Sequence, residues 1–140
     1  MAGELTFEQI QELVTTAPYH RWLGLKVLAV HEDGIEISAS WREEWVISSH
    51  RRFIHGGILA SLVDIAGDWA LVRRTGRGVP TINLHVDYHS AAAPGDLIAR
   101  GKVVKFGGQF STAEAQIFDQ AGKLLASGRG TYFTAPPKAS

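Results

Sequence analysis

The sequence contains no cysteine among its 140 residues, which excludes disulfides, thiolate catalysis and cysteine-bound zinc. It also has no excess of one charge, with 14 Lys and Arg against 14 Asp and Glu. No strong field therefore favours nucleic acid or an anionic membrane as a partner. No apolar run approaches the roughly 20 residues that span a bilayer, and the start, MAGELTFEQIQELV, lacks the basic-then-apolar order of a signal peptide. We expect a cytoplasmic protein that binds neither nucleic acid nor membrane.

Hydrophobic residues make up 45% of the chain and charged residues 20%, which is ordinary for a globular protein. A chain of this length builds a single hydrophobic core. We therefore predict one domain over residues 1–140. Residues 135–140, which include two consecutive prolines, are expected to form a frayed tail.

Hydrophobic periodicity predicts a short amphipathic helix over residues 6–14, ended by Pro18, and one long helix over residues 55–74, stopped at Gly76. Between them we expect a hairpin around Asp33-Gly34 and a loop over residues 42–54. Alternation and turn residues predict strands over residues 25–31, 35–41, 81–89, 96–106, 110–118 and 123–133. The turns between the last four strands make each an antiparallel neighbour of the next. The predicted fold is α+β: an antiparallel sheet of five or six strands against one long helix.

Two adjacent glycines and one carboxylate mark the long helix as a candidate site. Gly56 and Gly57 stand at its start, where unpaired N–H groups and partial positive charge suit an anion or an oxyanion. Asp64 lies further along the helix among apolar neighbours. Structural explanations stand beside this one: the glycines can serve close packing, and Asp64 can pair with a base such as Arg73. His55 can likewise be a hydrogen-bonding residue alone.

The spacing of these groups predicts that the site needs two chains. Gly56 and Asp64 are eight residues apart, which places them about 12 Å apart along a helix axis. A reacting carbonyl must lie about 3 Å from its oxyanion donor and in contact with its nucleophile or base. One copy of the helix cannot supply both groups to one carbon. Two antiparallel helices across a twofold axis can, so we predict a homodimer with two shared sites.

The pattern His55-Gly56-Gly57, four residues, Leu62, any residue, Asp64 resembles the hotdog-fold acyl-CoA thioesterases of the phenylacetate-degradation (PaaI) type. The segments Val86–His89, Ala93–Asp96 and Gly122–Tyr132 are also similar to that family. The resemblance covers residues 15–134. The position of the motif before a helix, with the acid at the right offset, makes the combination specific.

This resemblance implies a hotdog fold, with the sheet wrapped around one long central helix, and hydrolysis of an acyl-CoA to the free acid and coenzyme A. The backbone N–H of Gly56 would polarise the thioester carbonyl. Asp64 of the other subunit would attack the carbonyl or activate water. His55 would shape the loop and hold the carbonyl end. The family uses no metal or bound cofactor, and coenzyme A is part of the substrate. A homodimer or homotetramer is expected.

Three positions depart from the family pattern. Ser49 stands where an asparagine is frequent, Arg52 replaces a glycine, and Asp68 replaces a serine or threonine. Asp64 and Asp68 are one helical turn apart, so at least one of their pKa values should be raised. Our hypothesis is that Asp68 is partly protonated and donates a hydrogen bond in place of the missing hydroxyl. The alternative is a solvated or interface residue.

Further substrate contacts are expected around the cleft. Basic residues suit the phosphates of coenzyme A. The candidate substrate-binding residues are Gly57, Ser49, Asp68, His50, Arg52 and Lys105. Three tryptophans can line an acyl or aryl pocket or belong to the core: Trp41, Trp45 and Trp69.

One strand carries His85, Asp87 and His89 on a single face, a metal-triad pattern that we interpret instead as a wet or subunit-contacting face. The opposite face, with Ile82 and Tyr88 at its ends, is expected to point to the core. We predict no metal.

Two other functions fit the same resemblance. A non-catalytic acyl-CoA-binding or regulatory hotdog domain would hold the thioester without cleaving it, and the departures at Ser49, Arg52 and Asp68 are compatible with this. A hydratase or dehydratase is less favoured, because those families place histidine and acid differently. Acyl chain length and aryl or alkyl preference are not encoded in any motif of the chain.

Overall fold

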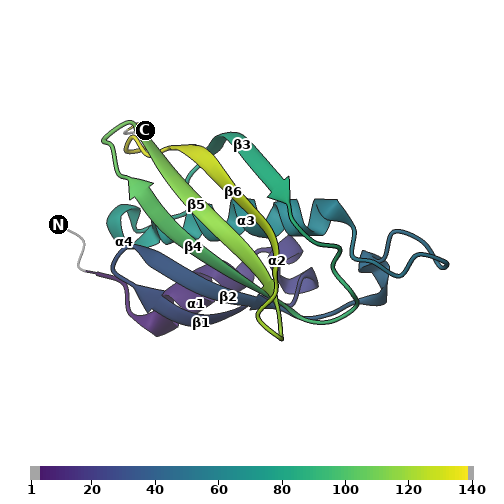
Figure 1. The fold of residues 1–140 in the computed structure, drawn as a ribbon. Helices are drawn as coiled ribbons and strands as arrows, with labels where there is room; N and C mark the ends of the chain where they lie inside the picture. The colour runs from purple at the N-terminus through teal and green to yellow at the C-terminus, as the bar shows by residue number, and fades with distance from the viewer. Residues whose placement is uncertain (1–3, 139–140) are drawn as a thin grey trace.

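A computed structural model describes residues 4–138. Within them one antiparallel sheet has the strand order β1-β2-β4-β5-β6-β3, and the helices lie together on one of its faces (Figure 1). The strands of this sheet are β1 (Lys26–His31), β2 (Gly34–Ala39), β3 (Thr81–Tyr88), β4 (Leu97–Lys105), β5 (Phe110–Asp119) and β6 (Leu124–Phe133). The predicted α+β architecture, a six-stranded sheet around a long helix, is confirmed.

Two short helices precede the sheet. Helix α1 (Phe7–Thr16) begins at Thr6, whose hydroxyl accepts a hydrogen bond from the Gln9 N–H in a capping box. It buries Ile10 and packs on β1. Pro18 ends this helix, as predicted, but it also starts a second helix, α2 (Pro18–Trp22), because proline is well suited to the first helical position. The sequence analysis missed α2.

The long helix is α3 (Gly56–Ala70), followed by the short helix α4 (Val72–Thr75). The prediction of one continuous helix over residues 55–74 is wrong at Leu71. The N–H of that residue donates to the Asp68 carbonyl three positions back, which tightens and ends the α-helical turn. Gly76, with a φ of 70°, ends α4 as predicted.

The strand order confirms three of the predicted antiparallel pairs and contradicts one. β1 pairs with β2, β4 with β5, and β5 with β6, whereas β3 pairs with β6 and not with β4. The segment between β3 and β4 is not a tight turn. The His89 N–H donates to the Leu125 carbonyl, and the Ala92 carbonyl accepts from the Ile54 N–H, so this segment crosses the end of the sheet.

Strand β3 is an edge strand, and the face predicted to point to the core is only partly buried. Leu84 and Val86 are half-buried and pack against the core, as expected. Ile82 is 54% exposed and Tyr88 is 55% exposed, so the expectation is wrong for these two residues. No element of the described residues pairs with the outer edge of β3. An edge strand with exposed apolar side chains is a ready surface for strand pairing with another chain.

The core lies between α3 and the sheet. Leu59, Leu62 and Ala66 are buried from the helix side, and Trp45 is fully buried below the start of the helix. Trp45 belongs to a 3-10 turn, η1 (Glu43–Trp45), inside the segment that we expected to be a plain loop. None of the helices in residues 4–138 combines the length and apolar character that a bilayer crossing requires.

The end of the chain is partly tied down. The Arg77 guanidinium donates to the Ala135 carbonyl at 2.8 Å, so the predicted fraying does not begin at residue 135. Residues 139–140 of the predicted tail, and residues 1–3, lie outside the described residues.

Close approach of α3 to the sheet makes Gly101→Ala a test of this packing. A Cβ at Gly101 would lie 2.0 Å from the Ala66 carbonyl oxygen, and β4 cannot retreat because it is paired on both sides. We expect a loss of about 3 kcal/mol or more in the free energy of unfolding, measured by urea denaturation at fixed protein concentration. Gly108→Ala, where the Cβ meets open space, is the control and should change stability by less than about 0.5 kcal/mol. Equal denaturation midpoints for the two variants would contradict this packing.

Candidate active site

The first turn of α3 leaves one backbone donor free. His55 is the N-cap, and its Nδ1 accepts a hydrogen bond from the Gly57 N–H at 3.0 Å. The Ile58 N–H donates to the His55 carbonyl. The Gly56 N–H has no acceptor among residues 4–138. This N–H therefore remains available to a ligand at the positive end of the helix dipole.

The hydrogen bond from the Gly57 N–H also determines the tautomer of His55. Because the neutral His55 ring accepts at Nδ1, its proton resides on Nε2, which is then a donor. The explanation of His55 as a hydrogen-bonding residue is thus confirmed for one ring nitrogen. The other ring nitrogen is left as a donor at the start of α3.

Tyr88 holds the glycine pair from the side of β3. Its hydroxyl donates to the Gly56 carbonyl at 2.9 Å. A Cβ at Gly56 would lie 3.2 Å from the tyrosine ring, so the glycine allows close approach of the ring. The close-packing explanation of Gly56 is therefore correct, and it accompanies a free N–H. Sequence analysis assigned Tyr88 to the core and missed this contact.

The segment before α3 is anchored in the core. The His55 N–H donates to the Trp45 carbonyl at 2.7 Å, and Trp45 is fully buried. The Ile47 N–H donates to the Phe53 carbonyl, which closes residues 46–54 into a loop that projects beyond the start of α3 (Figure 1). Of the two explanations for Trp45, the core explanation is correct. Its anchoring positions the His55–Gly56 peptide.

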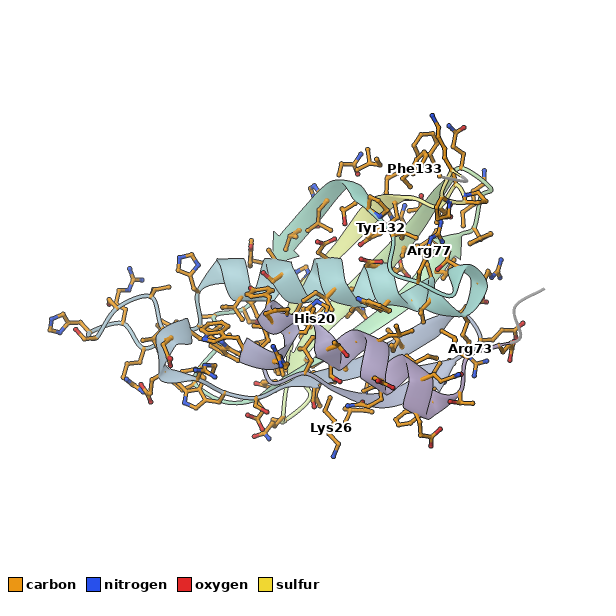
Figure 2. All side chains as sticks on the ribbon, turned by 180° about the vertical axis from the view of Figure 1, so that it is seen from behind. His20, Lys26, Arg73, Arg77, Tyr132 and Phe133 are labelled. Carbon is orange, nitrogen blue, oxygen red and sulfur yellow. The ribbon has the colours of Figure 1, made fainter. Side chains whose placement is uncertain are left out.

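Asp64 bonds to a hydroxyl and not to a cation. Its Oδ1 accepts a hydrogen bond from the Thr81 hydroxyl, at the start of β3, at 2.7 Å. The proposed pairing with Arg73 is wrong, because Arg73 forms an ion pair with Glu4 at 3.7 Å and lies on the side of α3 away from Tyr132 (Figure 2). The negative charge of Asp64 is therefore not neutralised by a paired base. Thr81 carried no signal in the sequence, since its contact depends on the position of β3 beside α3.

Asp68, one turn further along, is more deeply enclosed. Its Oδ1 accepts a hydrogen bond from the Val79 N–H at 2.8 Å. Burial, and to a smaller extent the charge of Asp64, raises the pKa of Asp68 to about 7, although the bond from Val79 opposes this shift. The prediction that one carboxyl of the pair has a raised pKa is confirmed for Asp68. Donation of a hydrogen bond by Asp68 stays a prediction.

Tyr132 closes this region from β6. Its buried hydroxyl donates to the Asp64 backbone carbonyl at 3.3 Å, beside the C-terminal half of α3 (Figure 2). Burial, followed by the charges of Asp64 and Asp68, raises the pKa of Tyr132. The phenol therefore stays protonated. Gly67 makes room for it, because a Cβ there would lie 2.4 Å from the hydroxyl.

One chain thus holds two half-sites on the same side of α3. At the start of the helix, Gly56 is bonded to Tyr88; two turns later, Asp64 is bonded to Thr81. Thr81 and Tyr88 are the two end residues of β3. The separation of about 12 Å along the axis of α3 holds the two half-sites apart within one chain.

The remaining predicted substrate residues divide between the two ends of α3. Ser49, His50 and Arg52 are exposed in the loop before the helix, near Gly57, which is also exposed. Lys105 ends β4 at the other end of the helix.

Several of these side chains already have contacts. Arg52 donates two hydrogen bonds to the Glu43 carboxylate, which lowers the pKa of Glu43. Trp41 packs edge-on against Trp45, with ring centroids 5.8 Å apart, and Trp69 is half-buried beside Gly78.

The strand face with alternating histidines does not assemble a metal site. His85 pairs with Asp87 at 3.1 Å, whereas His89 bonds to Ser127 at 2.7 Å. Among residues 4–138 no group of three His, Cys, Asp or Glu side chains is placed to hold a metal ion. His85 and Asp87 line a hollow of about 1060 Å³ whose other lining residues come from β1, β2, β4, β5, β6 and the β1–β2 turn. This hollow includes neither Gly56 nor Asp64.

Comparisons with known proteins agree with this architecture. The family model described as "Thioesterase superfamily" matches residues 52–126. A solved structure of a thioesterase superfamily protein is 50% identical, covers 90% of this chain and 96% of its own, and has a TM-score of 0.87. The PaaI protein of the Escherichia coli phenylacetic acid degradation operon is 24% identical over 81% of this chain and 85% of its own, with a TM-score of 0.71, which shows a common fold.

A protein of Halobacterium salinarum, named as a candidate esterase, is 37% identical over 89 residues. That match covers 56% of this chain and 58% of the relative, so the chain spans a little over half of that protein's length. The matched family residues include the His55-Gly56-Gly57 turn, Asp64 and all of β3. The chain therefore belongs to the thioesterase superfamily and has the hotdog fold.

Proposed function

We propose that this protein hydrolyses an acyl-CoA thioester to the free acid and coenzyme A, at a site shared by two copies of the chain. One observation supports this most strongly. The Gly56 N–H lacks an acceptor among the described residues, while Asp64 keeps a carboxylate without a paired cation. The Gly56 N–H can serve as an oxyanion donor and the Asp64 carboxylate as a nucleophile or base. Together these two groups suit acyl transfer.

The chemistry follows from these two groups. The thioester carbonyl oxygen accepts a hydrogen bond from the Gly56 N–H, where the helix dipole stabilises the negative charge that develops. His55 Nε2–H is a second donor for the carbonyl end. Asp64 either attacks the carbonyl carbon, forming an anhydride that water then hydrolyses to the free acid, or takes a proton from a water that attacks directly. In both cases the C–S bond breaks with its electron pair leaving on sulfur. A thiolate is a good leaving group, so the site needs no general acid.

Strand β3 explains how two copies complete one site. Its outer edge is unpaired within the described residues, and antiparallel pairing of two copies of β3 about a twofold axis extends the sheet. Such pairing brings Thr81 of one chain opposite the partner's Tyr88. The Asp64 half-site of one chain is then beside the Gly56 half-site of the other. A tetramer formed from two such dimers is the larger assembly that we expect.

The loop before α3 suits the nucleotide part of coenzyme A. His50 and Arg52 are exposed there. The Arg52 Nη2 donates to both oxygens of Glu43, and a phosphate would have to share or displace that carboxylate. The second candidate, a domain that binds acyl-CoA without cleaving it, rests on Ser49, Arg52 and Asp68, which depart from the family pattern. Release of free thiol distinguishes hydrolysis from binding alone.

Asp64→Asn should lower kcat by two or more orders of magnitude, because the amide keeps the shape and the bond to Thr81 but is neither a nucleophile nor a base. The measurement is thiol release from a panel of short, medium and aryl acyl-CoA thioesters. Glu12→Gln, which neutralises an exposed carboxylate on α1, is the matched control and should match the parent. Full activity of Asp64→Asn would remove this residue from the mechanism.

Gly56→Pro should remove the oxyanion donor without removing the helix. Gly56 is the first residue of α3, where proline is favoured, and His55 already has φ −58° and ψ 135°, which a following proline tolerates. We expect a decrease in kcat of about 10²–10³. Gly56→Ala places the same Cβ against Tyr88 but keeps the N–H, so it controls for packing. Equal kcat values for the two variants would exclude Gly56 as the donor.

Mixing the two inactive variants tests whether the site is shared. In a mixed dimer of Asp64→Asn and Gly56→Pro chains, one site combines an intact Gly56 with an intact Asp64. Random mixing makes half of the dimers mixed, each with one working site of two, so co-expression should restore about one quarter of parental activity. If each chain carried a complete site, the mixture would be as inactive as its components.

A further inference from the structure

Asp68 has a polar partner that the reaction scheme does not use. It is enclosed on α3 one turn after Asp64, and its Oδ1 accepts the Val79 N–H at 2.8 Å. Val79 itself is buried and lies in the segment that leads from α4 into β3. A buried carboxylate that receives a single backbone bond costs desolvation free energy, which a neutral acceptor would avoid. This desolvation cost indicates that Asp68 has a role beyond packing.

The Val79 amide lies two residues from the hydroxyl that bonds Asp64. Between them, the Pro80 carbonyl accepts the Phe133 N–H at 2.8 Å, and Thr81 then donates to Asp64 at 2.7 Å. Proline fixes one of the backbone dihedrals in this short segment. Residues 79–81 therefore form a stiff connection held at three consecutive points, and a displacement at Val79 is transmitted to Thr81.

We propose that Asp68 is a positioning residue for the reaction: by holding the Val79 amide, it places the Thr81 hydroxyl against the carboxylate of Asp64. This inference rests on the proposed function, because it takes Asp64 to be the nucleophile or base. Asp68 itself touches neither the substrate nor the reacting atoms. It acts through residues 79–81.

The surroundings of Asp68 make this positioning depend on pH. The charge of Asp64 on α3 acts on Asp68, the Tyr132 phenol on β6 feels the charges of both carboxylates, and the connecting segment presents the Val79 N–H. Burial raises the pKa of Asp68 to about 7. Below this pH the group is a neutral acid; above it, a carboxylate that holds the amide more strongly. Activity should therefore rise with pH through about 7.

Two substitutions separate position from charge. Asp68→Asn keeps a side-chain oxygen for the Val79 N–H but does not ionise, whereas Asp68→Ala removes the acceptor. With a thioester that the parent cleaves, we expect Asp68→Asn to match the parent below about pH 6 and to lack the rise through pH 7, ending about 3- to 10-fold lower at pH 8.5. Asp68→Ala should be about 10-fold or more lower in kcat across the range, with little change in KM. A rise through pH 7 that persists in Asp68→Asn would overturn the proposal.

A double-mutant cycle tests the route of the effect. Thr81→Val removes the hydroxyl at nearly constant volume. If Asp68 acts through Thr81, the change Asp68→Ala should lower kcat much less in the Thr81→Val background than in the parent. If the fold-decreases in kcat of the two single variants instead multiply in the double variant, Asp68 does not act through Thr81 and the proposal is wrong.

Amide hydrogen exchange keeps the test independent of activity and of the stability of Asp68→Ala. The Val79 amide should be protected in the parent and in Asp68→Asn, and should exchange at least 10-fold faster in Asp68→Ala. Rapid exchange at Val79 in the folded parent would overturn the anchoring. If the parent releases no thiol, the proposed function fails while exchange still reports the anchor. If the parent cleaves thioesters and all Asp68 variants share its pH profile, only the positioning role fails.

Discussion

The two hydrogen bonds between strand β3 and helix α3 are the constraint on which the candidate site depends. Thr81 at one end of the strand bonds Asp64, and Tyr88 at the other end bonds Gly56. The same strand is paired to β6 on one side only. The element that positions both chemical groups is therefore also the element whose free edge can receive a second chain. In the proposed dimer, association of the chains and assembly of the site are therefore linked through one strand.

Glycines at the contact between α3 and the sheet make this arrangement sterically feasible. A Cβ at Gly101 would collide with the Ala66 carbonyl, one at Gly128 would lie 2.6 Å from a methyl of Val63, and one at Gly67 would collide with the Tyr132 hydroxyl. Without these side chains the helix lies close to β4 and β6. Asp64 and Asp68 are thereby brought within reach of the residues that lead into and begin β3.

The sequence predicted what local pattern controls, and it missed what depends on strand order. The hairpin at Asp33-Gly34, the helix start at Gly56 and the stop at Gly76 follow from turn and cap chemistry, and the structure contains all three. The predicted pairing of β3 with β4 was wrong, because a connection of several residues does not determine which strand β3 pairs with. Thr81 and Tyr88 could not be identified for the same reason, since their contacts exist only once β3 lies beside α3.

The electrostatics of the candidate site suit a reaction that needs a nucleophile or base but no general acid. A cation beside Asp64 would stabilise its charge but reduce its basicity, whereas the Thr81 hydroxyl orients the carboxylate without neutralising it. A second acid, Asp68, lies one turn away, and burial raises its pKa to about 7. The start of α3 supplies positive potential at the Gly56 end of the helix. In the proposed two-chain site, negative charge passes from the carboxylate of one chain to the substrate oxygen beside the helix start of the other, and no ion pair has to be buried.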